Sequence, residues 1–185
     1  IFYRKMHYNK FEFFTYVDSL NQENIVKLNK KVHIIFRNYK KRFKNHELLD
    51  FVNFCKKKNL KIYLSNDIKK AKNLGFDGVY VPSFNKLPLN YDIGIKNGFT
   101  ILGSAHNINE LLIKKKQKID IIFICPLFKN KKNNNNLGVV RFNLISKYFE
   151  KKVMALGGIN RKNKNMLKLL NIYGFAAISY FKNTI

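Results

Sequence analysis

A pair of adjacent glycines is the first feature of the sequence that could bind a ligand. The stretch Lys152–Asn160 is an apolar run that ends in Gly157 and Gly158 and leads into helical spacing from Asn160 onward. Glycine permits positive φ and close approach of the backbone to a ligand, and a helix start directs N–H groups at an anion. The stretch Gly174–Tyr180 repeats the arrangement. Because the last two loops of a strand-helix barrel commonly bind phosphate, the sequence predicts a phosphate site at these positions: Gly157, Gly158, Ile178 and Ser179.

A histidine and a serine lie two residues apart at the end of another apolar run. His106 directly precedes Asn107 and Glu110, which have the spacing of a capping box, so that His106 should lie just before a helix. An imidazole there can carry a proton. The alternative, that His106 only hydrogen-bonds its own turn, fits the pattern equally well. Ser104 belongs to the same turn and is a second candidate.

Charged residues follow other strand-like runs. Arg37 needs an anionic partner if its stem is buried at a strand end, and with only 11 acidic residues in the chain a ligand is a better partner than a carboxylate. Asn66 and Asp67 follow the run 61–65, although Asp67 is also a natural helix N-cap that would occur there without any ligand. Lys132, in a lysine- and asparagine-rich loop, is a candidate to close over a phosphate; a solvated charge run is the alternative.

The composition indicates one globular domain, 1–185, without a membrane-spanning run or a secretory signal, and hence a cytoplasmic protein. The net charge is +25, but the lysine excess is spread over the whole chain, so we expect anionic small molecules as partners and no specific nucleic acid or membrane. Cys55 and Cys125 are far apart in the sequence and are expected to be reduced core residues.

Eight apolar runs alternate with mostly helical segments, which favours a closed (β/α)₈ TIM barrel over a doubly wound sheet. The length is just below the usual lower bound of about 200 residues, so the barrel should be compact. Residues 180–185, which follow Ser179, are too few for a full closing helix, so we expect that helix to be missing. The runs are 13–17, 32–37, 61–65, 78–82, 100–104 and 119–125, together with the two glycine-associated runs described above. Expected helices include one capped by Asn45, one over 107–116 and a short one before Gly98.

Several of these segments together resemble the thiamine phosphate synthase/TenI family over nearly the whole chain. The resemblance rests on Arg37, Asn66–Asp67, GVYVP, GSAHNINE, CPLF, ALGGIN and AAIS, in this order and spacing. It implies a (β/α)₈ barrel whose phosphate site holds a small phosphorylated thiazole. In the synthase branch it also implies Mg²⁺ and the pyrophosphate of a hydroxymethylpyrimidine diphosphate on the side of Asn66 and Asp67.

The sequence departs from the synthase pattern. The strand-two glutamine, arginine and lysine of that branch correspond to Ile35, Arg37 and Tyr39, and the second magnesium aspartate falls near Asn85. Losing one carboxylate weakens divalent-metal binding. The turn with Ser104 and His106 is more similar to the TenI branch, whose members tautomerise a thiazole carboxylate phosphate by acid–base catalysis without a metal.

Three functions therefore stay open. The favoured one is a TenI-like tautomerase that needs no cofactor. The second is a thiamine phosphate synthase with Mg²⁺ at Asp67, and the third is a non-catalytic binder of a phosphate ligand. A homodimer is left open. The predicted catalytic residues are His106, Ser104 and Arg37, and the predicted phosphate-binding residues are Gly157, Gly158, Ile178, Ser179 and Lys132.

Overall fold

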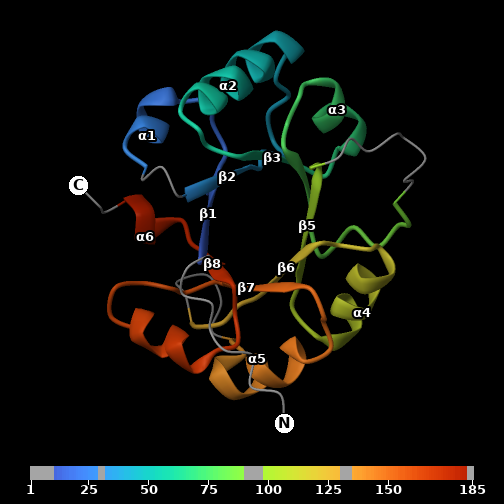
Figure 1. Ribbon diagram of the computed structural model, residues 1–185, viewed down its shortest axis with the longest axis vertical. Coiled ribbons are helices and arrows are strands. Elements are labelled where there is room, and N and C mark those ends of the chain that lie inside the picture. Colours follow the sequence, from blue (N-terminus) through green and yellow to red (C-terminus); the bar gives the residue numbers. More distant parts are fainter. Residues whose placement is uncertain (1–10, 29–31, 90–97, 130–134, 183–185) are drawn as a thin grey trace.

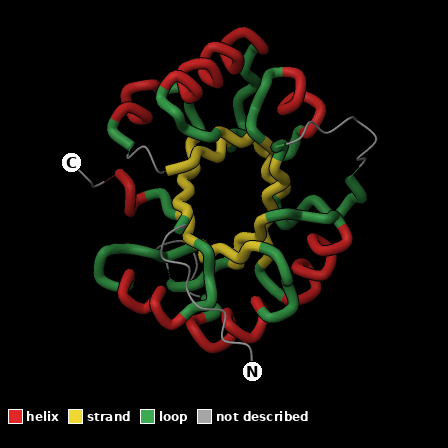
Figure 2. The backbone as a smooth tube through the Cα atoms, viewed as in Figure 1, coloured by secondary structure: helices red, strands yellow, loops and turns green. Residues whose placement is uncertain are grey.

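Eight parallel strands close into a single barrel with helices outside it (Figure 1). The computed structural model describes residues 11–28, 32–89, 98–129 and 135–182. The strands follow one another around the ring in chain order, β1 to β8, and β8 pairs with β1 to close it (Figure 2). The predicted (β/α)₈ barrel is confirmed.

The element bounds differ from the expected runs by a few residues at most strand ends. The strands are β1 (Glu12–Val17), β2 (Val32–Phe36), β3 (Ile62–Ser65), β4 (Gly78–Val81), β5 (Thr100–Ala105), β6 (Ile121–Ile124), β7 (Lys152–Leu156) and β8 (Gly174–Ala176). The helices are α1 (Gln22–Val26), α2 (Asn45–Lys57), α3 (Ile68–Asn73), α4 (Ile108–Lys116), α5 (Gly138–Ser146), the 3₁₀ helix η2 (Lys164–Leu169) and α6 (Ser179–Lys182).

The strands are apolar on both faces because each face is covered. Alternate side chains, among them Phe14, Tyr63 and Phe123, fill the barrel interior, and the intervening ones pack against the helices. On α2, Val52 and Cys55 are fully buried against the barrel, as the helical spacing predicts. Cys125 is buried as well, and both thiols are free.

Two helix starts differ from the sequence-based expectation. Helix α2 is capped by Lys44 rather than by Asn45, and the Lys44 backbone N–H donates to the Glu47 carboxylate at 2.7 Å. No α-helix begins at Asn160: turns lead instead into η2, because the side chains of Asn160 and Asn163 accept backbone N–H groups in this segment and close it locally. The helix expected before Gly98 lies outside the described residues.

Helices α5 and α6 belong to the outer layer of the barrel. Helix α5 was not expected, since it follows a loop whose composition conceals its start. Helix α6 directly follows the last strand and contributes Tyr180 and Phe181, which pack on Phe175 of β8. Within the described ranges, no helix has the length and apolar character needed to cross a bilayer.

Candidate active site

The carboxyl ends of the strands open on one side of the barrel, which we call the mouth. Because all neighbouring strands are parallel, residues that directly follow a strand reach this same side. The predicted residues that follow strands are thereby brought to the mouth: Arg37 after β2, Asn66 and Asp67 after β3, His106 after β5, Gly157 and Gly158 after β7, and Ile178 and Ser179 after β8. Lys132 lies outside the described residues.

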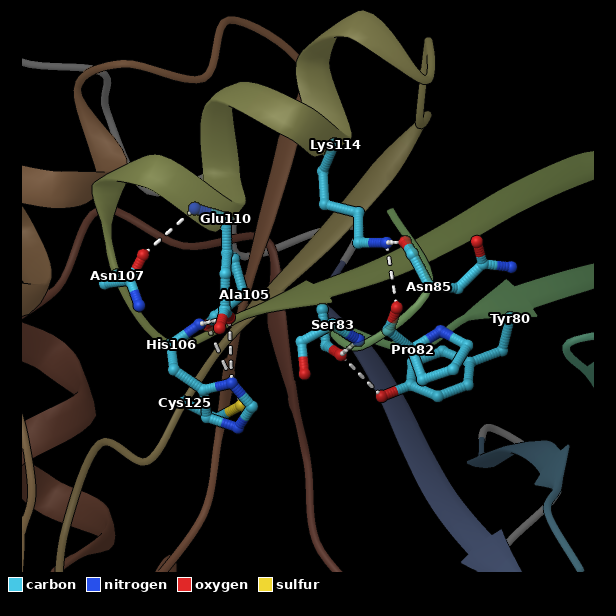
Figure 3. A network of polar contacts seen from close by, with 11 residues as sticks. Tyr80, Pro82, Ser83, Asn85, Ala105, His106, Asn107, Glu110, Lys114 and Cys125 are labelled. Carbon is cyan, nitrogen blue, oxygen red and sulfur yellow. Dashed lines mark hydrogen bonds and ion pairs between the residues drawn. The ribbon is translucent and has the colours of Figure 1, made fainter. Parts of the chain in front are cut away.

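Ser104, a buried residue near the end of β5, belongs to a polar network whose partners Tyr80 and Ser83 are labelled in Figure 3. The Tyr80 hydroxyl donates to Ser104 Oγ at 2.8 Å, and the backbone N–H of Ser83 donates to the same oxygen at 3.1 Å. A serine oxygen has two acceptor positions and one proton to give. Both acceptor positions are occupied, so Ser104 is arranged to act as a hydrogen-bond donor rather than as a base.

His106 and Glu110 form a pair at the start of α4 (Figure 3). Glu110 Oε2 accepts the His106 backbone N–H at 2.7 Å and lies 2.9 Å from Nδ1 of the same imidazole. Asn107 accepts the Glu110 backbone N–H, as its predicted capping role requires. Glu110 reaches back to His106 rather than to Asn107, which differs from the expected capping box by one residue.

The pairing leaves one imidazole nitrogen available. The His106 side chain is 48% exposed, and its Nε2 has no hydrogen-bond partner among the described residues. The interpretation that His106 bonds its own turn is confirmed. Proton transfer by His106 stays a prediction, for which Nε2 is the available nitrogen.

Arg37 lies over an aromatic ring. Its guanidinium carbon is 4.4 Å from the centroid of the Tyr16 ring, a cation–π contact. Within the ranges that the structure describes, Arg37 makes no ion pair. Burial raises the pKa of Tyr16 well above its ordinary value, so the phenol stays neutral and does not balance the charge. Binding of an anionic ligand by Arg37 stays a prediction.

Asn66 and Asp67 lie beside the loop that follows β4. Asp67 Oδ1 accepts the Lys70 backbone N–H at 2.8 Å, so its predicted capping role is confirmed. The Asn85 side-chain amide donates to Asn66 Oδ1 at 2.7 Å, which places Asn85 beside this pair.

Asn66 and Asp67 supply few of the ligands that a magnesium ion needs. Mg²⁺ is usually held by one or two carboxylates together with phosphate oxygens and water. Asp67 offers one carboxylate, already engaged through one oxygen, and the described residues contain no group of three His, Cys, Asp or Glu side chains that could hold a metal ion. These side chains alone do not fit a magnesium site.

The glycine pair after β7 touches the loop that follows β6. Gly157 and Gly158 have φ values of +97° and +70°. A Cβ atom on Gly157 would lie 2.9 Å from Pro126 Cα, and one on Gly158 would lie 2.3 Å from the Phe128 carbonyl oxygen. Positive φ and close approach both require glycine here.

A cavity of about 380 Å³ lies beside this glycine pair. It is lined by Asn160, Arg161, Lys162, Ser179 and Tyr180, so that two cations join a residue of the predicted phosphate site. Sequence reasoning missed Arg161 and Lys162, although both directly follow the glycine stretch. Ile178 precedes Ser179 and is 42% exposed. Ser179 lines this cavity, whereas Gly157, Gly158 and Ile178 do not, and the phosphate site stays a prediction.

Two aromatic side chains form another edge of the mouth. The Tyr39 hydroxyl lies 2.7 Å from Ser65 Oγ, and the Tyr39 ring contacts Phe84 edge to face, with centroids 5.7 Å apart. Both rings are exposed. No local sequence pattern predicts this contact, which joins the loops after β2 and β4.

A larger cavity, of about 850 Å³, lies at the opposite end of the barrel. Its lining includes Glu12, His33 and Lys61, at or just before the starts of β1, β2 and β3. Barrel enzymes carry their active sites at the carboxyl ends of the strands. The smaller cavity at the mouth is therefore the candidate for substrate binding.

The fold defines a (β/α)₈ barrel protein with its candidate site at the mouth. The sequence model of the TMP-TENI family, described as thiamine monophosphate synthase, matches residues 20–181. The chain belongs to this family.

Individual relatives agree with this placement. A thiamine-phosphate synthase of Koribacter versatilis (strain Ellin345) is 30% identical over 92 residues, which is 48% of this chain and 44% of that relative. The chain thus matches less than half of that protein's length.

Solved structures show the same fold. A thiamine phosphate pyrophosphorylase from Pyrococcus furiosus has a TM-score of 0.72 at 20% identity, covering 92% of this chain and 87% of that one. A thiamine phosphate pyrophosphorylase from Bacteroides thetaiotaomicron has a TM-score of 0.63 at 15% identity, covering 95% and 86%. At these identities the structural likeness supports the barrel and not a particular activity.

Proposed function

We propose that the protein is a TenI-like tautomerase that moves a proton on a thiazole carboxylate phosphate. The observation that carries this proposal is the pair of His106 and Glu110 at the mouth. Glu110 holds the imidazole by Nδ1 and leaves Nε2 facing outward. A carboxylate that orients an imidazole in this way is the usual arrangement for a general acid–base catalyst.

The other residues of the mouth have supporting roles in this mechanism. Nε2 of His106 takes a proton from one position of the substrate and returns it at another, so no proton is gained or lost overall. The Ser104 oxygen already accepts two hydrogen bonds, so its hydroxyl donates a hydrogen bond to an acceptor atom of the substrate and transfers no proton. Arg37 balances the negative charge of the substrate.

A thiamine phosphate synthase is the second candidate, favoured by the names of the relatives. In this reaction Mg²⁺ would bind together with the pyrophosphate of a pyrimidine diphosphate. Asp67, at the start of α3, would be the carboxylate that the protein supplies. Since the protein donors alone do not fit the metal, most of its ligands would have to come from the substrate.

A paired assay distinguishes the candidates. We expect tautomerisation of the thiazole carboxylate phosphate at the same rate with magnesium and with chelator, and no thiamine phosphate from the pyrimidine diphosphate and thiazole phosphate in either condition. Magnesium-dependent thiamine phosphate would overturn the tautomerase in favour of the synthase. Binding of thiazole phosphate without either turnover would leave a non-catalytic binder.

Arg37 provides a test of anion binding at the mouth. Replacing Arg37 by methionine should weaken binding of thiazole phosphate about 10- to 100-fold, because a charge-assisted hydrogen bond contributes about 1.5–3 kcal/mol. Isothermal titration calorimetry measures the loss. The matched control is Arg42→Met, because Arg42 is an exposed arginine five positions further along the chain. Equal affinities of the two variants would place the anion elsewhere.

A further inference from the structure

Lys114 is a fully buried lysine on the inner side of α4, with 0% of its surface exposed. Its ammonium group donates to the carbonyl oxygens of Pro82 at 2.8 Å and Asn85 at 2.6 Å (Figure 3). It also donates to Gln117 Oε1 at 2.8 Å. An ammonium group has three protons to donate. All three are matched by these acceptors.

Burying this charge is costly. The three acceptors are neutral, and no carboxylate among the described residues forms an ion pair with Lys114. Burial lowers its pKa to about 8, opposed by the nearby Glu110 carboxylate. A charge without an ionic partner is disfavoured in a protein interior, and an apolar side chain would pack α4 at lower cost. The position is therefore explained by what the ammonium group holds rather than by packing.

What it holds is the segment Pro82–Leu87 that follows β4. Gln117, one turn further along the helix, donates from Nε2 to the carbonyl oxygens of Asn85 at 3.2 Å and Leu87 at 2.5 Å. The two side chains of α4 thus bind three carbonyl groups of one short segment. A segment without regular secondary structure gains from them the fixed position that a strand ladder would otherwise give.

The segment Pro82–Leu87 in turn contacts residues in or directly after the two strands that flank β4 in the ring. On one side the Ser83 backbone N–H donates to Ser104 Oγ at 3.1 Å. On the other the Asn85 amide donates to Asn66 Oδ1 at 2.7 Å. Movement of this segment would release one of the two hydrogen bonds that orient the Ser104 hydroxyl.

We propose that Lys114 is a positioning residue, which fixes the segment Pro82–Leu87 from behind and thereby aims the Ser104 hydroxyl at the substrate. This inference rests on the proposed function only in naming the substrate as a phosphorylated thiazole. The positioning itself concerns contacts within the free protein.

The first test compares Lys114→Met with Lys116→Met, an exposed lysine on the same helix. Hydrogen–deuterium exchange of residues 82–89 in the ligand-free protein should be at least tenfold faster in Lys114→Met and unchanged in Lys116→Met. Affinity for thiazole phosphate should fall about tenfold in Lys114→Met alone. Equal exchange in the two variants would overturn the inference, whether or not the wild-type protein binds thiazole phosphate.

A double-mutant cycle separates positioning from a general loss of stability. If Lys114 acts through Ser104, the losses of affinity in Lys114→Met and Ser104→Ala should not add, because the second change removes a hydroxyl that is already misplaced. Additive losses would overturn the inference. If Lys114→Met does not fold, Gln117→Met replaces it in both experiments, since it removes the hydrogen bonds to Asn85 and Leu87 together with one of the three acceptors that hold the Lys114 ammonium.

Failure of the proposed function has a different signature. Wild-type protein that neither turns over the thiazole carboxylate phosphate nor binds thiazole phosphate would refute that function, while faster exchange of residues 82–89 in Lys114→Met would still support the inference that Lys114 fixes this segment. Faster exchange with unchanged affinity would show that the segment does not position the binding site, and would overturn the inference.

Discussion

Replacing His106 by glutamine is expected to lower the turnover of the thiazole carboxylate phosphate by about 10²- to 10⁴-fold, the usual contribution of a general acid–base group. Glutamine can keep a hydrogen bond to Glu110, but it cannot take up a proton and return it. The dissociation constant of the substrate should stay nearly unchanged, because in the proposed site Arg37 and the glycine loop, not His106, bind the anionic part of the substrate. Steady-state kinetics and calorimetry on the same preparation measure the two effects.

Two further variants complete this experiment. His46→Gln is the matched control, since His46 is exposed in the first turn of α2, and it should retain full turnover. Glu110→Gln should have a smaller effect than His106→Gln, because an amide oxygen can still accept from Nδ1 but carries no charge to stabilise a protonated imidazole. Full turnover in His106→Gln would show that His106 is not the proton carrier and that it only stabilises its own turn.

The barrel and the side on which the site lies could be predicted from the sequence, because both depend on local patterns. Apolar runs separated by helical segments require a parallel sheet covered on both faces, and polar residues at the ends of parallel strands must share one edge. Capping residues such as Asp67 and Asn107 were recognisable because their partners lie within three residues. These predictions needed no knowledge of tertiary contacts.

The features that were missed depend on contacts between distant residues. Lys114 donates to a carbonyl 32 positions away, and in the sequence it belongs to a row of three lysines of the kind common at the carboxyl end of a helix. Arg37 was expected to meet an anion, and its contact with the Tyr16 ring appears only when β1 and β2 pair. The failed helix at Asn160 shows a third limit, since asparagine side chains there satisfy backbone groups that a helix start would have left open.

Replacing Gly158 by alanine is expected to lower the free energy of unfolding by about 3 kcal/mol or more, as overpacking adds to the strain of positive φ. The new Cβ would lie 2.3 Å from the Phe128 carbonyl oxygen and 2.6 Å from that of Lys129, and backbone atoms cannot move aside as a flexible side chain can. The loops after β6 and β7 must then separate. Urea unfolding measures the loss of stability.

Gly138→Ala is the control that isolates the contact. Gly138 has φ +64°, close to the +70° of Gly158, but the nearest atom to its added Cβ lies 4.0 Å away. This variant should lose only the strain of the left-handed conformation, about 1–2 kcal/mol. The excess loss in Gly158→Ala then measures the contact between the two loops. Residues 160–162, which line the smaller cavity, follow Gly158 closely in the sequence. Gly158→Ala should therefore also weaken the binding of thiazole phosphate, whereas Gly138→Ala should leave this affinity unchanged. Equal effects of the two substitutions on stability and on binding would mean that the phosphate site does not depend on the close approach of these loops.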